Sequence, residues 1–73
     1  MDYDELREIL DTHTIRYRLI NSKGLISYDD NKIYLNPLYN DDCKTLYHEA
    51  LHYWSDMVEG LHLSEDEVEE RTT

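Results

Sequence analysis

The sequence predicts a single small α+β domain that spans residues 1–73. Apolar residues recur at helical spacing near the N-terminus, alternate with polar residues through the middle of the chain, and return to helical spacing after Pro37. A chain of this length buries only about 60% of the surface that its unfolded form exposes, so its core is small. We therefore expect a bound metal or a partner chain to add stability.

The first expected element is a short amphipathic helix over Tyr3–Asp11. Asp2 and Glu5 have the spacing of a capping box, and apolar side chains follow every three or four residues. Residues 14–20 then alternate between apolar and polar side chains. That period of two predicts a half-buried strand.

Two further strands are expected at residues 25–28 and Lys32–Leu35. Residues 29–31 form a turn-forming cluster between them, which favours a hairpin and hence a small antiparallel sheet. We expect Lys32–Leu35 to be the edge strand, because it leads into the longest helix, and we expect that edge to accept a peptide as an added strand.

The longest helix is expected between an N-cap at Asn40 and a stop at Gly60. Its periodicity places one apolar stripe toward the core, made of Cys43, Leu46, Tyr47, Ala50, Trp54, Met57 and Leu61. His48 and His52 fall on the other side. A last short helix is expected from Ser64, whose spacing to Glu67 matches a second capping box. His13 and His62 fall in turns, where we expect them to be exposed.

Residues 48–52 have the pattern HExxH, with His48 and His52 one helical turn apart. Side chains at positions i and i+4 project to the same side of a helix, so two imidazole nitrogens can share one zinc ion. Glu49 is not needed as a ligand and can serve as general base on a water that the metal activates. The competing interpretation is a pair of surface histidines on a polar helix face.

The third zinc ligand is expected from the last helix. The long helix continues for about 10 Å beyond His52, and three extended residues bring the chain back by about the same distance. This returns Glu65 to the level of His52, with Asp66 and Glu69 as the alternatives within the same acidic run. If Glu65 is the ligand, Glu69 lies one turn later and can accept the remaining imidazole proton of His48.

The composition restricts the compartment and the partners. The formal charge is −10, with 17 acidic and 7 basic residues, so nucleic acid is not an expected partner. No stretch has the length of a membrane span, and the acidic first twenty residues do not resemble a signal peptide. Cys43 is the one cysteine, which favours the reducing cytoplasm and, from its place on the apolar stripe, a buried side chain.

Three segments resemble small HExxH metallopeptidases of the zincin class: KIYLNP, TLYHEALHYW and GLHLSEDEVEER, within residues 32–71. These are the gluzincin-type minimal proteins related to the ImmA/IrrE family and to small phage and archaeal zincins. The resemblance implies zinc as cofactor, His48, His52 and Glu65 as its ligands, and Glu49 as catalytic base.

The expected function is therefore that of a zinc metallopeptidase, a hydrolase whose substrate is a peptide or protein, with an acidic surface that favours basic or neutral peptides. The alternative is a non-catalytic acidic binding or inhibitor protein in which zinc only holds the fold. Glu49 favours the enzyme, because a structural site has no use for an acid beside an open coordination position.

Overall fold

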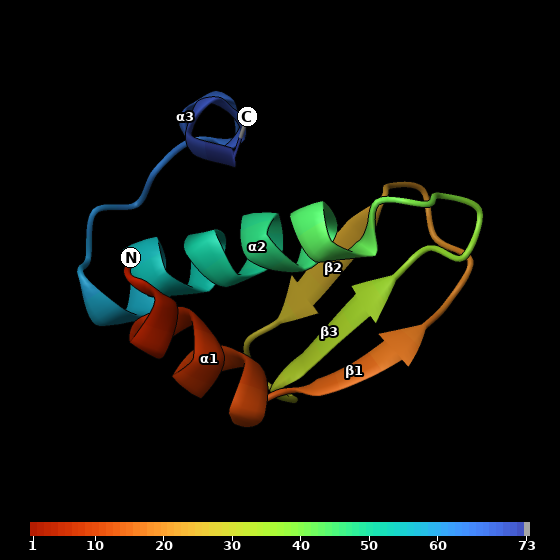
Figure 1. Ribbon diagram of the computed structural model, residues 1–73, viewed down its shortest axis with the longest axis horizontal. Helices are drawn as coiled ribbons and strands as arrows, with labels where there is room; N and C mark the ends of the chain where they lie inside the picture. The colour runs from red at the N-terminus through yellow and green to blue at the C-terminus, as the bar shows by residue number, and fades with distance from the viewer. Residues whose placement is uncertain (73) are drawn as a thin grey trace.

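The computed structural model describes residues 1–72, and Thr73, the last residue of the predicted domain, lies outside them. The fold is α+β, as predicted. Along the chain lie α1 (Tyr3–Asp11), β1 (Thr14–Tyr17), β2 (Gly24–Ser27), β3 (Lys32–Leu35), α2 (Asp42–Tyr53), a π-helical turn η1 (Trp54–Val58) and α3 (Glu65–Thr72) (Figure 1). None of the described helices has the length and apolar character needed to cross a membrane.

The sheet is mixed, so the expected antiparallel sheet is wrong in one of its two pairings. β2 and β3 form the predicted antiparallel hairpin, with Ile26 opposite Ile33. β1 pairs with β3 in parallel, with Ile15 beside Ile33. Residues 18–23 carry the chain past the position that β3 later fills, and the strand order becomes β1-β3-β2.

β3 is therefore the central strand, and its expected place at the sheet edge is wrong. Ile33 and Leu35 are 0% and 1% exposed, whereas all four residues of β1 are exposed. The strand with the best-buried apolar side chains takes the position that has a neighbour on either side. The edges of the sheet are β1 and β2.

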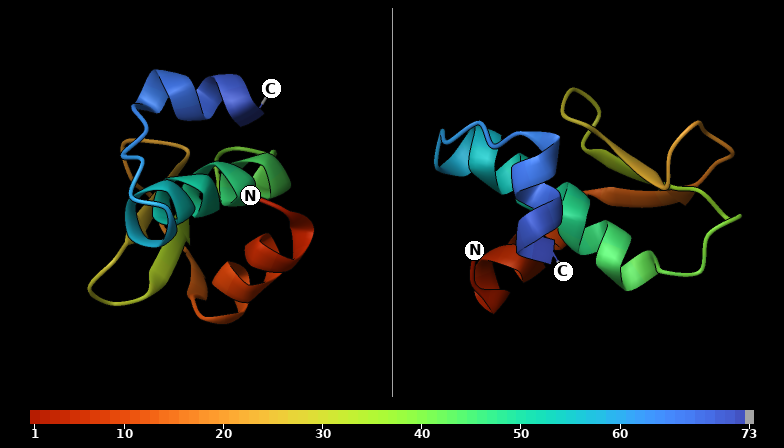
Figure 2. Two further views of the ribbon diagram at one scale, coloured as in Figure 1. Left: turned by 90° about the vertical axis from the view of Figure 1, so that its left-hand side faces the viewer. Right: turned by 90° about the horizontal axis from the view of Figure 1, so that it is seen from above.

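α2 lies across one face of the sheet, and α1 packs against α2 on the same side (Figure 2). The core between these layers consists of Ile9, Ile33, Leu35, Ala50 and Leu51. Gly24 permits the close approach of β2 to α2, because a Cβ atom there would lie 2.5 Å from Cγ2 of Thr45. Gly24 therefore lies on the face of the sheet that is turned toward α2.

The buried face of α2 differs from the expected apolar stripe. Cys43 and Met57 are exposed, as is Leu61 beyond the helix end. The buried positions of α2 and η1 are Thr45, Glu49, Ala50, Leu51 and Ser55. α2 contacts the sheet, α1 and α3 on different sides, so no single stripe describes its packing. Its N-cap is Asp41, one residue after the expected Asn40.

α3 returns over α2 from a linker with two left-handed residues, Gly60 at φ 67° and His62 at φ 53°. The predicted capping box is present, since the backbone N–H of Glu67 donates to Oγ of Ser64 at 3.3 Å. Val68, 0% exposed, anchors α3 on α2. The result is a short acidic helix held above the face of α2 that carries the HExxH pattern (Figure 2).

His62 is exposed, as expected, but the expectation for His13 is wrong. His13 is 7% exposed and its Nδ1 lies 2.7 Å from the backbone carbonyl of Ile9. The ring packs edge-on against Tyr53, with 4.7 Å between centroids. A residue that follows a helix end is buried here because Tyr53 of α2 covers its ring.

Candidate metal centre

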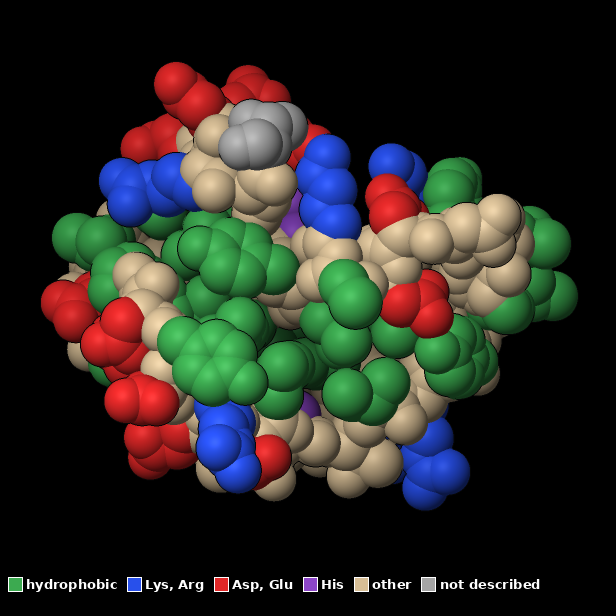
Figure 3. All heavy atoms as spheres, viewed as in Figure 1, with side chains coloured by type: hydrophobic (Ala, Val, Ile, Leu, Met, Phe, Trp, Pro, Cys, Tyr) green, Lys and Arg blue, Asp and Glu red, His purple; other side chains and the backbone are tan. Residues whose placement is uncertain are grey.

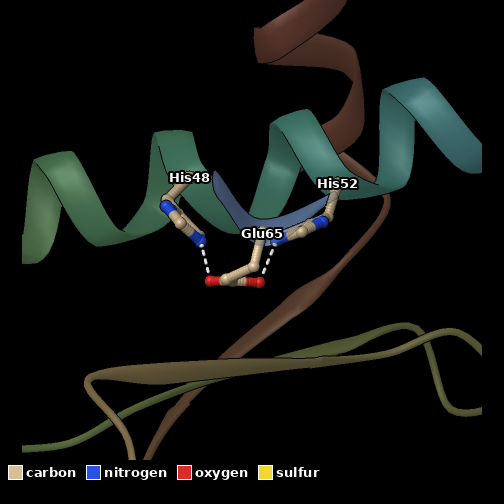
Figure 4. A group of neighbouring side chains, drawn as sticks. All are labelled: His48, His52 and Glu65. Atoms are coloured by element: carbon tan, nitrogen blue, oxygen red, sulfur yellow. Dashed lines mark hydrogen bonds and ion pairs between the residues drawn. The ribbon is translucent and has the colours of Figure 1, made fainter. Parts of the chain in front are cut away.

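The two histidines of the HExxH pattern lie side by side on α2, on the face that α3 covers (Figure 4). One helical turn separates them, and their ring centroids are 5.0 Å apart. The side chains of His48 and His52 are only 13% and 16% exposed. They are held between two helices, and their rings are not free surface groups.

Glu65, in the first turn of α3, reaches both imidazoles. Its Oε1 lies 2.6 Å from Nε2 of His48 and its Oε2 lies 2.7 Å from Nε2 of His52. One ligand atom from each of the three residues lies within 4.8 Å of the other two. In the part of the chain that the structure describes, this is the group of His, Cys, Asp and Glu side chains that could hold a metal ion, and Asp66 is not a member.

Glu69 lies one turn further along α3, at the other nitrogen of His48. Its Oε2 is 3.1 Å from Nδ1 of that ring and its Oε1 is 3.9 Å from the ammonium group of Lys44. A proton kept on Nδ1 by this neighbouring carboxylate leaves the Nε2 lone pair of His48 directed into the three-residue group. The structure thus brings Glu69 to the place that the sequence predicted.

The electrostatics of Glu65 and Glu49 differ. For Glu65 partial desolvation acts to raise the pKa, but the hydrogen bonds and positive charges of His48 and His52 outweigh it and hold the pKa below its ordinary value. For Glu49 burial raises the pKa, and the two histidines oppose this shift only in part. One carboxylate is therefore kept ionised, while its neighbour is made a better proton acceptor.

Glu49 is 9% exposed and lies at the wall of a cleft of about 320 Å³. One wall comes from residues 22–24, which lead into β2, and the other from the first turns of α2 and from α3. His48 and Glu65 of the metal group thus line the same cleft as Glu49, whereas His52 does not. The lining residues are Ser22, Lys23, Gly24, Asp41, Lys44, Thr45, His48, Glu49, Glu65 and Glu69.

The donor set of two imidazole nitrogens and one carboxylate suits zinc. A tetrahedral zinc ion with bonds of about 2.0–2.1 Å separates its ligand atoms by about 3.3 Å. The two oxygens of Glu65 lie closer than this to the imidazole nitrogens, at 2.6 and 2.7 Å, while the ligand atoms of the group are up to 4.8 Å apart, so the carboxylate and the rings must both adjust to admit the ion. The side chain of Glu65 is 72% exposed, so it has room to move toward that spacing.

The sequence interpretation did not place Lys23 and Lys44 at the site, although both line the cleft. Lys44 had a usable signal, since it lies four residues before His48 and hence on the same helical face. Lys23, 3.3 Å from Asp41, had none, because its position depends on how β2 lies against α2.

The chain was compared with protein-family models, with curated proteins and with solved structures, and none of them matches it. The three-residue group and the buried glutamate beside it are thus the observations from which a function can be inferred.

Proposed function

We propose that the protein is a zinc metallopeptidase of the minimal zincin kind, in which His48, His52 and Glu65 hold the ion. The observation that carries this proposal is the convergence of these side chains on one point from two helices. Glu49 lies in the same cleft without joining the group. An acid that is buried beside a ligand set, but not part of it, is typical of a hydrolytic site.

The proposed roles follow from the chemistry of each group. When bound, zinc would polarise the scissile carbonyl and acidify the attacking water. Glu49 accepts the proton that water loses and returns it to the leaving amine, for which a raised pKa is favourable. Glu69 holds the ring of His48 in one orientation and tautomer.

A peptide is the substrate class that suits the surroundings of the cleft. The residues before β2 form one wall, and β2 is a sheet edge, so an extended peptide can lie along it as an added strand. This replaces Lys32–Leu35, which is central, in that role. With Cys43 as its one cysteine, the protein suits the reducing cytoplasm.

Glu49→Gln tests the proposal. The zinc content and the fold should be retained, because Glu49 is not a ligand, while cleavage of any peptide in a diverse library should fall by at least about 100-fold. Glu59→Gln, at an exposed glutamate beyond the site, is the control and should cleave as the native protein does. Native zinc protein that cleaves nothing would instead support a non-catalytic acidic binding protein with structural zinc.

A further inference from the structure

One face of the sheet is left uncovered. Gly24 is turned toward Thr45 of α2 and pairs with Leu35, so the alternate residues of each strand point to the opposite face. That opposite face carries Lys32 and Tyr34 of β3, with Arg16 of β1 and Leu25 of β2 on either side. The described helices lie on the other side of the sheet (Figure 2).

The uncovered face is basic on an acidic protein. Arg16, Arg18 and Lys32 are three of the seven basic residues, and no strand residue is acidic. Among the described residues none of the three has a carboxylate within ion-pair distance, whereas Lys23 and Lys44 both have one. Figure 3 shows the opposite side of the molecule, where acidic side chains gather over α3 and along the side of α1. The face therefore holds cations whose counterions are not supplied by the described residues.

The three cations are evenly spaced along the strand direction. Lys32 is in register with Thr14, so along the strand direction Lys32, Arg16 and Arg18 follow one another at intervals of two residues, about 6.6 Å each, with Lys32 one strand, about 4.8 Å, to the side. Arg18 continues the line beyond β1, because its backbone N–H donates to the carbonyl of Leu35 at 2.8 Å. Its guanidinium lies 5.7 Å from the centroid of the Tyr34 ring, which holds it at the face.

We infer that this face, formed by Arg16, Arg18, Leu25, Lys32 and Tyr34, docks an extended segment of a partner protein with carboxylates at alternate positions. Alternate side chains of an extended peptide repeat at the same interval as the cations. Tyr34 and Leu25 supply apolar contact between them. A segment of four or five residues spans the face of about 13 Å. A nucleic acid is a poorer fit, because its long run of phosphates meets the field of a protein of charge −10.

The inference is tested by titrating the full-length, isotope-labelled protein with the peptide Ser-Glu-Ser-Glu-Ser-Glu-Ser and following backbone amide shifts. Shifts should concentrate in Thr14–Tyr17, Gly24–Ser27 and Lys32–Leu35. A peptide of the same composition with its three glutamates adjacent should bind more weakly, because only two of its carboxylates reach the cations at once. Binding at the cleft between α2 and α3 instead of the sheet would overturn the inference.

Two double variants distinguish the effect of the cations on this face from the effect of the net charge on peptide binding. Arg16→Ser with Lys32→Ser should raise the Kd by about fivefold, the size expected for two exposed ion pairs. Arg7→Ser with Arg71→Ser changes the net charge equally at exposed positions of α1 and α3, and should leave the Kd unchanged. Equal losses in both, no measurable binding of the peptide, or tighter binding of a thymidine oligonucleotide of matched charge would each refute an acidic peptide as the partner.

Discussion

Oε2 of Glu69 lies 3.1 Å from Nδ1 of His48. The opposite nitrogen of the same ring is 2.6 Å from Glu65, so one helical turn of α3 contacts the imidazole at both ends. α3 has eight residues and one buried apolar side chain, Val68, which is little to hold so short a helix in place. Metal binding and the docking of α3 on α2 are therefore expected to strengthen each other.

Zinc should bind at one equivalent and raise the melting temperature, because it joins two helices of a chain with a small core. At free zinc a thousandfold above the Kd the stabilisation is about 4 kcal/mol. His52→Ala should abolish both effects, whereas His62→Ala, at an exposed histidine outside the group, should abolish neither. Calorimetric titration and thermal unfolding give the two readouts, and a His52→Ala protein with native affinity would show that the assigned pair is wrong.

Glu65→Ala should weaken zinc binding much more than Asp66→Ala. The two residues are adjacent, exposed and equally charged, but Glu65 alone contacts both imidazoles. Loss of one of three protein ligands should cost at least about 100-fold in affinity, and loss of a neighbouring charge only a few-fold. Competition against a chelator of known affinity measures the difference. Similar losses in the two variants would mean that the acidic side chains of α3 attract zinc through their summed charge, and that Glu65 is not a specific ligand.

Glu49→Gln should stabilise the metal-free protein. Burial raises the pKa of Glu49 in the folded state, so between the unfolded and the folded pKa the native protein binds more protons folded than unfolded. The contribution of Glu49 to the free energy of unfolding therefore falls as the pH rises through that window. Below both values the carboxyl is protonated in either state and the difference vanishes.

The measurement is thermal unfolding in chelator from about pH 4 to pH 7. The gain in melting temperature of Glu49→Gln over the native protein should grow as the pH rises across this range. Glu59→Gln, at an exposed position, should show no such trend. A Glu49→Gln protein that is less stable than native at pH 7 would contradict the assigned cost of burying the carboxylate.

Gly24→Ala should destabilise the fold by about 1–3 kcal/mol, the usual cost of overpacking. The added Cβ atom would lie 2.5 Å from Cγ2 of Thr45 and 3.2 Å from the carbonyl oxygen of Tyr34. Thr45→Ser removes the methyl group at the closer contact, so the double variant should recover part of the loss. Denaturant unfolding of the four proteins gives the coupling energy. Additive effects would show that the Gly24–Thr45 contact does not limit how closely β2 approaches α2.

Local patterns were sufficient to predict the fold class, α1, the β2–β3 hairpin and the α3 cap. These features depend on residues close in sequence: the Asp2 capping box is present, and the Lys32–Leu35 strand has the predicted bounds. The approach of Glu65 to His52 was also predictable, because helix rise and chain length fix how far the linker can return.

Four other predictions that depended on tertiary neighbours failed: the pairing of β1, the place of β3, and the burial of Cys43 and of His13. The parallel pairing of β1 and the central place of β3 follow from where residues 18–23 cross, and no local pattern encodes that path. Cys43 lies on the apolar side of a helical projection but is exposed, so that projection alone does not give its burial. His13 is buried because Tyr53, distant in sequence, covers it.

The strand order has a consequence for how the chain folds. β2 and β3 are joined by a short turn, and a hairpin of this kind forms within about 1–10 μs. β1 pairs only with β3, on the side of β3 away from β2. Pairing of β1 with β3 therefore closes a longer loop than the hairpin does, and it requires that β3 is already in place. A chain emerging from the ribosome therefore keeps Thr14–Tyr17 unpaired until Leu35 has been synthesised, and changes in the turn at residues 29–31 should slow formation of the whole sheet.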